Sequence, residues 1–311
     1  MRIFRCRAAG LALLAVAAAS CGGGSKEAGG PASAASEARS PVGFRTETFT
    51  FTESGADPAS AGRSLVTTVY YPAASGDGQV AAEGAPPATA RGPLPLVLFS
   101  HGGGTTGTSY SNLLTRVASA GYVVAAPNYG GQTGDPTSRP ADARFVISQV
   151  LTTSADPTHP LAGLVDSRRV AAMGHSMGGG ITLGFVFNTC CLDDRVQAAV
   201  LLASARPAYP GEAFPPPGVP ALVVHGDADT RAPYAEGRRL FEQMRSPKYL
   251  LTIHGGEHTP PFSGETQRAD ARIVVESIVA FLDRHLKGDP TALDRLAAAA
   301  GDPLVATLER G

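Results

Sequence analysis

A serine lies in a pentapeptide that is typical of an enzymatic nucleophile. Residues 174–178, Gly-His-Ser-Met-Gly, fit the pattern G-x-S-x-G, with Ser176 at the centre. An apolar β run precedes the pentapeptide and an apolar helical run follows it, so it is expected at a strand-to-helix turn. Such a turn is too tight for side chains at Gly174 and Gly178. We therefore predict that it lifts the Ser176 hydroxyl above the sheet, at the N-terminus of the next helix.

A serine hydroxyl is a weak nucleophile at neutral pH, so it needs a base that takes its proton and a carboxylate that holds the base. The loop after the expected strand 221–225 carries two carboxylates, Asp227 and Asp229. His258 lies in a loop beyond the next strand, whereas His254 ends that strand. The order serine, acid, histidine, each after a strand, is the order that accompanies a G-x-S-x-G turn of this kind. The residues alone predict His258 as the base and leave both carboxylates open.

The elements that must position these residues alternate along the chain. From residue 95 onward, apolar runs too short for helices alternate with segments of helical periodicity. This alternation predicts a mostly parallel sheet with helices on both faces. Two earlier runs have no helix between them, so we expect an antiparallel N-terminal edge, followed by a loop over 77–92. The expected strands are 46–52, 65–71, 96–100, 122–127, 170–173, 196–203, 221–225 and 249–254, and the expected helices are 110–120, 140–151, 181–188, 234–244 and 271–286.

Four motifs together resemble the α/β-hydrolase superfamily of serine esterases. They are His-Gly-Gly-Gly at 101–104, Gly-His-Ser-Met-Gly-Gly at 174–179, His-Gly-Asp-Ala-Asp at 225–229 and Gly-Glu-His at 256–258, in this order. The likeness is closer to the secreted branch of cutinase-like polyester hydrolases, platelet-activating-factor acetylhydrolases and dienelactone-hydrolase-like proteins. It covers about residues 44–300. The resemblance implies a single α/β-hydrolase domain.

The resemblance also implies roles for individual residues. The second Asp of the loop is the acid in that branch, which corresponds to Asp229, with Asp227 as the alternate. The developing oxyanion needs fixed N–H donors, and these correspond to the backbone of Met177 and of Gly103, with Gly102 as the alternative to Gly103. Some polyester hydrolases bind calcium at the position of Asp227 together with a second carboxylate, but this chain has a histidine in place of that carboxylate.

The remaining histidines and the cysteines carry weaker signals. We expect His101 and His225 to be turn residues with satisfied ring nitrogens, and His175 to shape the pocket beside the nucleophile. Residues 254–258 match the zinc-protease pattern H-x-x-E-H, but that pattern needs a helix, and two consecutive glycines disfavour one. We expect no metal and no organic cofactor. The adjacent Cys190 and Cys191 fit either a vicinal disulfide or two free, buried thiols.

The N-terminus has the organisation of an export signal. Residues 1–20 contain three arginines and then an apolar run over 10–19 that is too short to span a bilayer. Small residues followed by Cys21 resemble a bacterial lipoprotein signal, which implies lipidation of Cys21. Cleavage by an ordinary signal peptidase is the alternative. Residues 21–40 are expected to form a flexible tether and residues 41–311 the folded domain, so the protein is expected to be exported, either as a cell-envelope lipoprotein or secreted.

Composition excludes several classes of partner. Lys plus Arg number 26 against 27 Asp plus Glu, a net charge of -1 without a basic stripe, which excludes an electrostatic case for nucleic acid. The expected partner is a small-molecule or polymeric ester. Membrane contact is expected only through the N-terminal lipid, and the expected oligomeric state is a monomer.

These observations predict a serine carboxylesterase that hydrolyses short- to medium-chain esters through an acyl-enzyme. The first alternative is a cutinase-like polyester hydrolase or a lipid acyl hydrolase, and the second is a non-catalytic envelope binding protein on the same fold. Segment 204–220 contains six prolines, which disfavours a helical lid. The chain has no Trp and has Ser-Ala-Arg at 204–206, where the cutinase-like branch commonly has an aromatic residue beside the cleft, which weighs against aromatic polyester.

Overall fold

The computed structural model describes residues 40–51, 62–76, 80–130, 136–216, 218–263 and 267–311. The predicted signal peptide over 1–20, Cys21 and the predicted tether up to residue 39 lie outside the described residues. Ser40 is already part of the folded unit, because its N–H donates to the carbonyl oxygen of Ser119 at 3.1 Å. In the described part of the chain no helix combines the length and apolar character that a membrane crossing requires.

The strands of the described residues form one ten-stranded sheet in the order β10-β9-β8-β7-β6-β4-β5-β2-β1-β3. The strands are β1 Val42–Thr50, β2 Ser64–Pro72, β3 Ala82–Glu83, β4 Leu94–Ser100, β5 Val123–Pro127, β6 Val165–His175, β7 Val196–Leu202, β8 Ala221–Gly226, β9 Lys248–Ile253 and β10 Ala306–Arg310. The run from β5 through β4, β6, β7 and β8 to β9 is parallel, and β1 and β2 add an antiparallel edge. The predicted mostly parallel sheet with an antiparallel N-terminal edge is confirmed.

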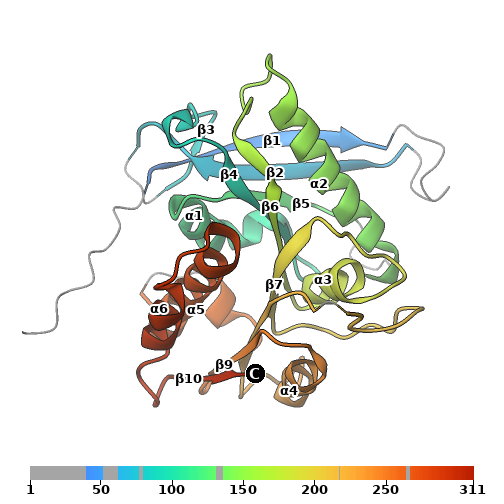
Figure 1. Ribbon diagram of the computed structural model, residues 1–311, viewed down its shortest axis with the longest axis vertical. Helices are drawn as coiled ribbons and strands as arrows, with labels where there is room; N and C mark the ends of the chain where they lie inside the picture. Colours follow the sequence, from blue (N-terminus) through green and yellow to red (C-terminus); the bar gives the residue numbers. More distant parts are fainter. Residues whose placement is uncertain (1–39, 52–61, 77–79, 131–135, 217, 264–266) are drawn as a thin grey trace, which may run out of the picture. The chain divides into compact units, whose positions relative to one another are not determined.

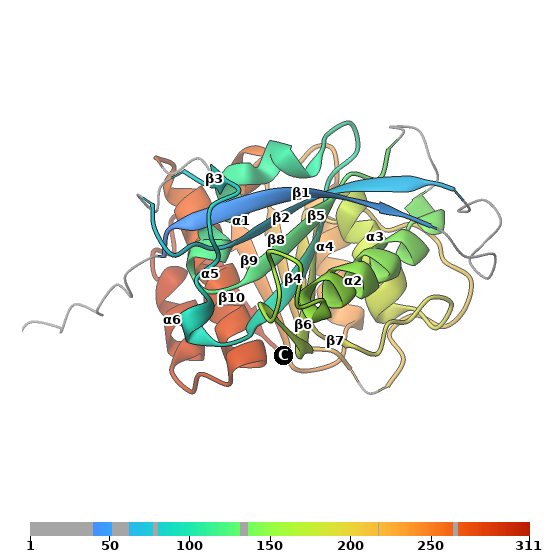
Figure 2. The same ribbon diagram turned by 90° about the horizontal axis from the view of Figure 1, so that it is seen from above.

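Helices cover both faces of this sheet. They are α1 Ser111–Ser119, α2 Pro140–Ala155, α3 Met177–Phe187, α4 Tyr234–Gln243, α5 Ala269–Leu282 and α6 Ala292–Ala299, with short 3₁₀ turns at Thr89–Arg91, Gly107–Tyr110, Pro136–Ser138 and Pro260–Phe262. α1, α5 and α6 lie on one side and α2, α3 and α4 on the other (Figure 2). Alternate residues of the central strands face opposite sides, so Val97 and Phe99 join one apolar core and Leu96 and Leu98 the other.

The structure differs from the expected elements at three places. A second antiparallel edge strand, β10, pairs with β9, and α6 precedes it. The expected loop over 77–92 contains the two-residue strand β3, which pairs with β1. The helix expected over 271–286 is α5 followed by a π turn over Asp283–Lys287, which ends where Gly288 takes a φ of 71°. None of these differences moves the strand ends that carry the candidate site.

The carboxyl ends of the parallel strands lie at one edge of the sheet, and the loops there hold all the candidate residues. β4 leads into the glycine run at 102–104, β6 into Ser176, β8 into Asp229 and β9 into His258 (Figure 1). Open α/β sheets bind their ligands at this edge. The fold therefore brings residues more than 150 positions apart in sequence to one place.

Candidate active site

Ser176 occupies a strained turn between β6 and α3. Its φ is 54° and its ψ is -118°, a conformation that a non-glycine residue adopts only under constraint. A Cβ at Gly174 would collide with the carbonyl of Gly178, and a Cβ at Gly178 would collide with the carbonyl of Ser100. Neighbouring backbone holds the turn, because the N–H of Ser176 donates to Leu202 at 2.9 Å and its carbonyl accepts from Ala205 at 2.9 Å.

Three side chains form a continuous chain of hydrogen bonds at this turn. The Oγ of Ser176 lies 2.9 Å from Nε2 of His258, and Nδ1 of His258 lies 2.7 Å from Oδ2 of Asp229. His258 is 7% exposed and Asp229 6% exposed, so bulk water does not compete strongly for either group. With Nδ1 donating to the carboxylate, Nε2 is free to accept the serine proton.

Backbone amides fix the carboxylate of Asp229. Its Oδ1 accepts from the N–H groups of Arg231 and Ala232, each at 2.9 Å. Burial raises the pKa of the Asp229 carboxyl, but the hydrogen bonds from His258 and from these two amides outweigh burial and leave the pKa below 3.8. The group is therefore ionised at neutral pH, as an acceptor for the Nδ1–H of His258 must be.

The alternate carboxylate has a different partner. Oδ2 of Asp227 lies 2.8 Å from Nδ1 of His254, and Oδ1 accepts from the N–H of Gly255 at 2.7 Å. The structure thus places Asp227 beside His254, and not beside His258. Residues 254–259 form no helix, so the H-x-x-E-H pattern is not assembled, and within the described ranges no three His, Cys, Asp or Glu side chains gather as metal ligands.

A second hydrogen-bonded chain runs behind the nucleophile, and the sequence did not predict it. Tyr110 Oη accepts from the N–H of Gly102 at 3.2 Å and lies 2.7 Å from Nδ1 of His175. Nε2 of His175 in turn lies 2.8 Å from the carbonyl of His258. Burial lowers the pKa of His175 to about 4, so its ring is neutral, with Nδ1 accepting and Nε2–H donating. This chain joins the glycine loop after β4 to the histidine loop after β9.

The two candidate oxyanion donors lie beside one another. Met177 is the first residue of α3, so its N–H has no acceptor within the helix. A Cβ at Gly103 would lie 4.0 Å from Cβ of Met177. Gly102 is buried and its N–H is bonded to Tyr110, whereas Gly103 is exposed. Of the two glycines, Gly103 has the amide that is not committed to Tyr110.

The prediction that His101 and His225 have satisfied ring nitrogens is confirmed for one residue and not for the other. His101 has both ring nitrogens satisfied, by the carbonyl of Gly102 at 2.9 Å and the N–H of Tyr129 at 3.3 Å, as predicted. The prediction for His225 is wrong in part. Its Nε2 donates to the carbonyl of Ala232 at 2.8 Å, but Nδ1 has no partner among the described residues. This nitrogen faces Gly237 of α4, which offers no side chain to accept or donate.

The adjacent cysteines form a vicinal disulfide. Cys190 and Cys191 are bonded in the turn after α3, so the alternative of two free thiols is wrong. Cys190 is exposed, not buried. This turn is also joined to segment 211–214, because the N–H of Thr189 donates to the carbonyl of Glu212 at 3.0 Å.

Comparison with known proteins assigns the family. The model of the family described as PET hydrolase-like matches residues 26–303. The chain belongs to the PET hydrolase-like family. The four sequence motifs indicated a cutinase-like hydrolase, and the family match agrees with that indication. The prediction that the chain is related to hydrolases of carboxylic esters is confirmed.

The relatives of this PET hydrolase-like chain include a terephthalate ester hydrolase, cutinases and a ferulic acid esterase. It is 27% identical over 205 residues to the bis(hydroxyethyl) terephthalate hydrolase of Streptomyces coelicolor, covering 64% of this chain and 57% of that protein. It is 28% identical over 211 residues to cutinase 2 of Thermobifida cellulosilytica, covering 66% of this chain and 74% of the cutinase. The chain thus spans little more than half of the first relative. A ferulic acid esterase structure from Streptomyces cinnamoneus, at 24% identity, matches with a TM-score of 0.62 over 84% of this chain and 94% of that one, which confirms the fold.

Proposed function

We propose that this chain is a serine hydrolase that cleaves carboxylic esters, including polyesters, through an acyl-enzyme on Ser176. The observation that carries the proposal is the chain of hydrogen bonds from Ser176 through His258 to Asp229, at 2.9 and 2.7 Å. The family match and the cutinase relatives favour the polyester alternative over a general short-chain esterase. Short soluble esters remain substrates of the same chemistry.

The proposed reaction uses each group at a stated atom. Oγ of Ser176 attacks the ester carbonyl while its proton passes to Nε2 of His258. The N–H groups of Met177 and Gly103 hold the negative oxygen of the tetrahedral intermediate. His258 then returns the proton to the leaving alcohol, and a water molecule repeats the sequence to release the acid. Asp229 stays ionised and holds the Nδ1–H of His258 throughout.

Access to the serine supports a polymeric substrate. Segment 204–216 contains no helix. It is fastened to α3, because Ala205 donates to the carbonyl of Ser176 and Oη of Tyr209 donates to the carbonyl of Gly180 at 3.0 Å. A segment held in this way cannot close over the serine as a lid. A chain segment of a solid polymer therefore needs no separate opening step to reach Ser176.

Two assays test the proposal. A fluorophosphonate probe should label the wild type and the Ser111→Ala variant, and should fail to label Ser176→Ala. Absence of labelling in folded wild-type protein would favour a non-catalytic binding protein. The wild type should release aromatic acid from amorphous polyester film, and Ser176→Ala should not. Cleavage of tributyrin without any release from film would restrict the function to short soluble esters.

We also propose that the protein is exported, with residues 1–20 as signal, 21–40 as tether and 41–311 as the folded domain. The basic and apolar N-terminus and Cys21 support this proposal. Mass spectrometry of the mature protein should find a diacylglycerol-modified Cys21 at its N-terminus, and Cys21→Ser should abolish the modification. If the mature protein instead has an unmodified N-terminus generated by an ordinary signal peptidase, the lipoprotein proposal is wrong and the protein is secreted.

A further inference from the structure

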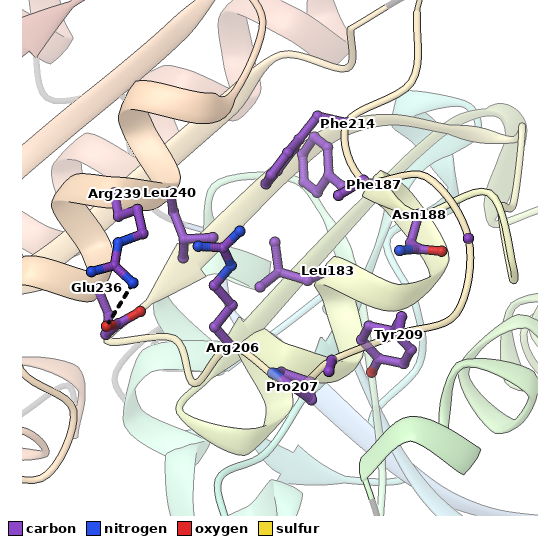
Figure 3. A pocket seen from close by; sticks show the side chains of 13 residues that line it. Leu183, Phe187, Asn188, Arg206, Pro207, Tyr209, Phe214, Glu236, Arg239 and Leu240 are labelled. Carbon is purple, nitrogen blue, oxygen red and sulfur yellow. Dashed lines mark ion pairs between the residues drawn. The ribbon is translucent and has the colours of Figure 1, made fainter.

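A cavity of about 380 Å³ lies beside the proposed nucleophile, between α3, α4 and segment 206–214 (Figure 3). It begins close to Ser176, because Arg206 lines it and the preceding residue, Ala205, donates to the Ser176 carbonyl at 2.9 Å. It then follows α3 to Leu183 and beyond. Leu183 is seven residues past Ser176, which is about 10 Å along a helix axis. A substrate that is cleaved at Ser176 can therefore extend into the cavity with its other end.

The walls of the cavity are largely apolar. Leu183 and Phe187 of α3 and Leu240 of α4 are buried and face it (Figure 3). Phe214 completes the wall, with its ring centroid 5.8 Å from that of Phe187. Phe214 has a φ of 57° and its N–H donates to the carbonyl of Phe187 at 2.7 Å, so its backbone is held in an unfavourable conformation. These walls fit an aromatic or aliphatic body.

Two hydrogen-bond donors in the cavity have no acceptor. Oδ1 of Asn188 accepts from the N–H of Cys190 at 2.9 Å, and its amide Nδ2 has no partner in the described part of the chain, although Asn188 is only 5% exposed. In Figure 3 this nitrogen faces the cavity and the oxygen faces away. Arg206 also makes no hydrogen bond or ion pair with any described residue, and its guanidinium extends across the cavity. Asn188 is a largely buried residue and Arg206 is an exposed one, and neither donor is committed to an acceptor within the described residues, so both are available to an acceptor that arrives with a ligand.

The charge of the lining indicates the chemistry of that acceptor. Arg239 lines the cavity and is paired with Glu236 at 3.5 Å, so the arginine charge of Arg206 is uncompensated. An adjoining groove shares Arg206 and Phe214 and adds Arg245. The lining is thus net positive in a chain whose net charge is -1. Arginine binds carboxylates through two parallel hydrogen bonds, which a neutral ester cannot match.

We propose that this cavity is a subsite for the carboxylate end of an acid with an apolar body. Cleavage of one ester of a dicarboxylic diester releases one alcohol and leaves such a half-ester, with one carboxylate and one remaining ester. The carboxylate would meet Arg206 and the Asn188 amide, and the apolar body would lie against Phe187 and Phe214. The inference rests on the proposed function and adds a class of substrate to it.

Binding to a variant without the nucleophile tests the subsite independently of turnover. Ser176→Ala protein is titrated with 4-ethylbenzoate and with neutral 4-ethylbenzamide by calorimetry. The acid should bind at least tenfold more tightly, and adding Arg206→Gln should remove most of that difference while leaving the amide unchanged. Arg238→Gln is the matched control, since Arg238 lies on α4, is not among the residues that line the cavity, and pairs with Glu242 and Glu309. Equal binding of acid and amide, or an equal loss in Arg238→Gln, would overturn the proposal.

Hydrolysis then identifies the source of the carboxylate. The value of kcat/KM is measured for monomethyl and dimethyl terephthalate in the wild type and in Arg206→Gln. A roughly tenfold loss confined to the half-ester assigns the subsite to the free end of the substrate. An unchanged half-ester rate, with acid binding still dependent on Arg206, assigns it to the released acid. If the wild type cleaves neither ester, the proposed function fails, and the Ser176→Ala titration still decides the subsite.

Discussion

Replacing Tyr110 by Phe tests whether the hydrogen-bonded chain behind the nucleophile positions the active site. The substitution keeps the ring, which is 3% exposed and lies 4.8 Å from the ring of Phe99, and removes only the hydroxyl. That hydroxyl joins the N–H of Gly102 to Nδ1 of His175. Its loss leaves both groups buried without a partner, and it frees His175 from the tautomer that donates to the carbonyl of His258.

The size of the effect follows from these two groups. A buried polar group that loses its partner costs about 1–3 kcal/mol, so two such groups give a loss of about 2–6 kcal/mol in the free energy of unfolding. For a domain of this size that is a fall in Tm of roughly 5–25 °C. If these hydrogen bonds also position the oxyanion loop and the His258 loop, their loss raises the activation free energy of ester hydrolysis as well. A rise of about 1.4 kcal/mol is a tenfold fall in kcat.

The control is Tyr122→Phe, which removes a buried hydroxyl bonded to Asp283 at 2.6 Å, away from the site. Urea unfolding and steady-state hydrolysis of a soluble p-nitrophenyl ester are measured for both variants at a temperature where both are folded. Tyr110→Phe should lose stability and about tenfold in kcat, and Tyr122→Phe should lose stability alone. A kcat for Tyr110→Phe within twofold of the wild type would refute the positioning argument. The hydrogen bonds of Tyr110 would then contribute to stability alone.

Further predictions follow from other contacts. Asp229→Asn should lower kcat by about 10³–10⁴-fold, because the amide cannot hold the imidazolium, while Asp227→Asn should stay within about threefold; the reverse order in ester hydrolysis assays would exchange their roles. Burial lowers the pKa of His285 from 6.5 to about 4, so the unfolded chain binds more protons between these values. Stability in urea should therefore fall from pH 6.5 toward 4, less steeply in His285→Phe; equal slopes would contradict this. Reduction of Cys190–Cys191 should cost only about 1 kcal/mol, since adjacent residues close a very short loop; a Tm loss far above a few degrees would contradict it.

The alternation of apolar runs and helical segments was sufficient to predict the parallel sheet and its order of functional loops. The residues alone did not distinguish Asp227 from Asp229, because both follow β8 within three positions. The distinction depends on where the loop turns: amides of Arg231 and Ala232 hold Asp229 toward His258, while Asp227 faces His254. Such backbone contacts have no periodic signal in a sequence.

The parts that could not be predicted depend on contacts between distant segments. β10 is an edge strand whose alternate residues Thr307 and Glu309 are not buried, so it lacks an apolar run. The bond between Tyr110 and His175 joins positions 65 residues apart, and either residue could equally have been a satisfied core residue. The orphan amide of Asn188 is visible only once the disulfide turn gives its oxygen a partner.

The strained turn at Ser176 makes catalytic competence a property of the completed fold. A φ of 54° is maintained from outside, by the carbonyl of Leu202 at the end of β7 and by the N–H of Ala205, and Ala203 between them is itself at a φ of 41°. The turn at Ser176 thus has no local preference for its active conformation and depends on the pairing of β7 with β6. Partly folded chains that have formed helices but not this strand pairing would carry every catalytic residue and yet be inert. Recovery of activity during refolding is therefore a reporter of the last docking step, and not of secondary structure.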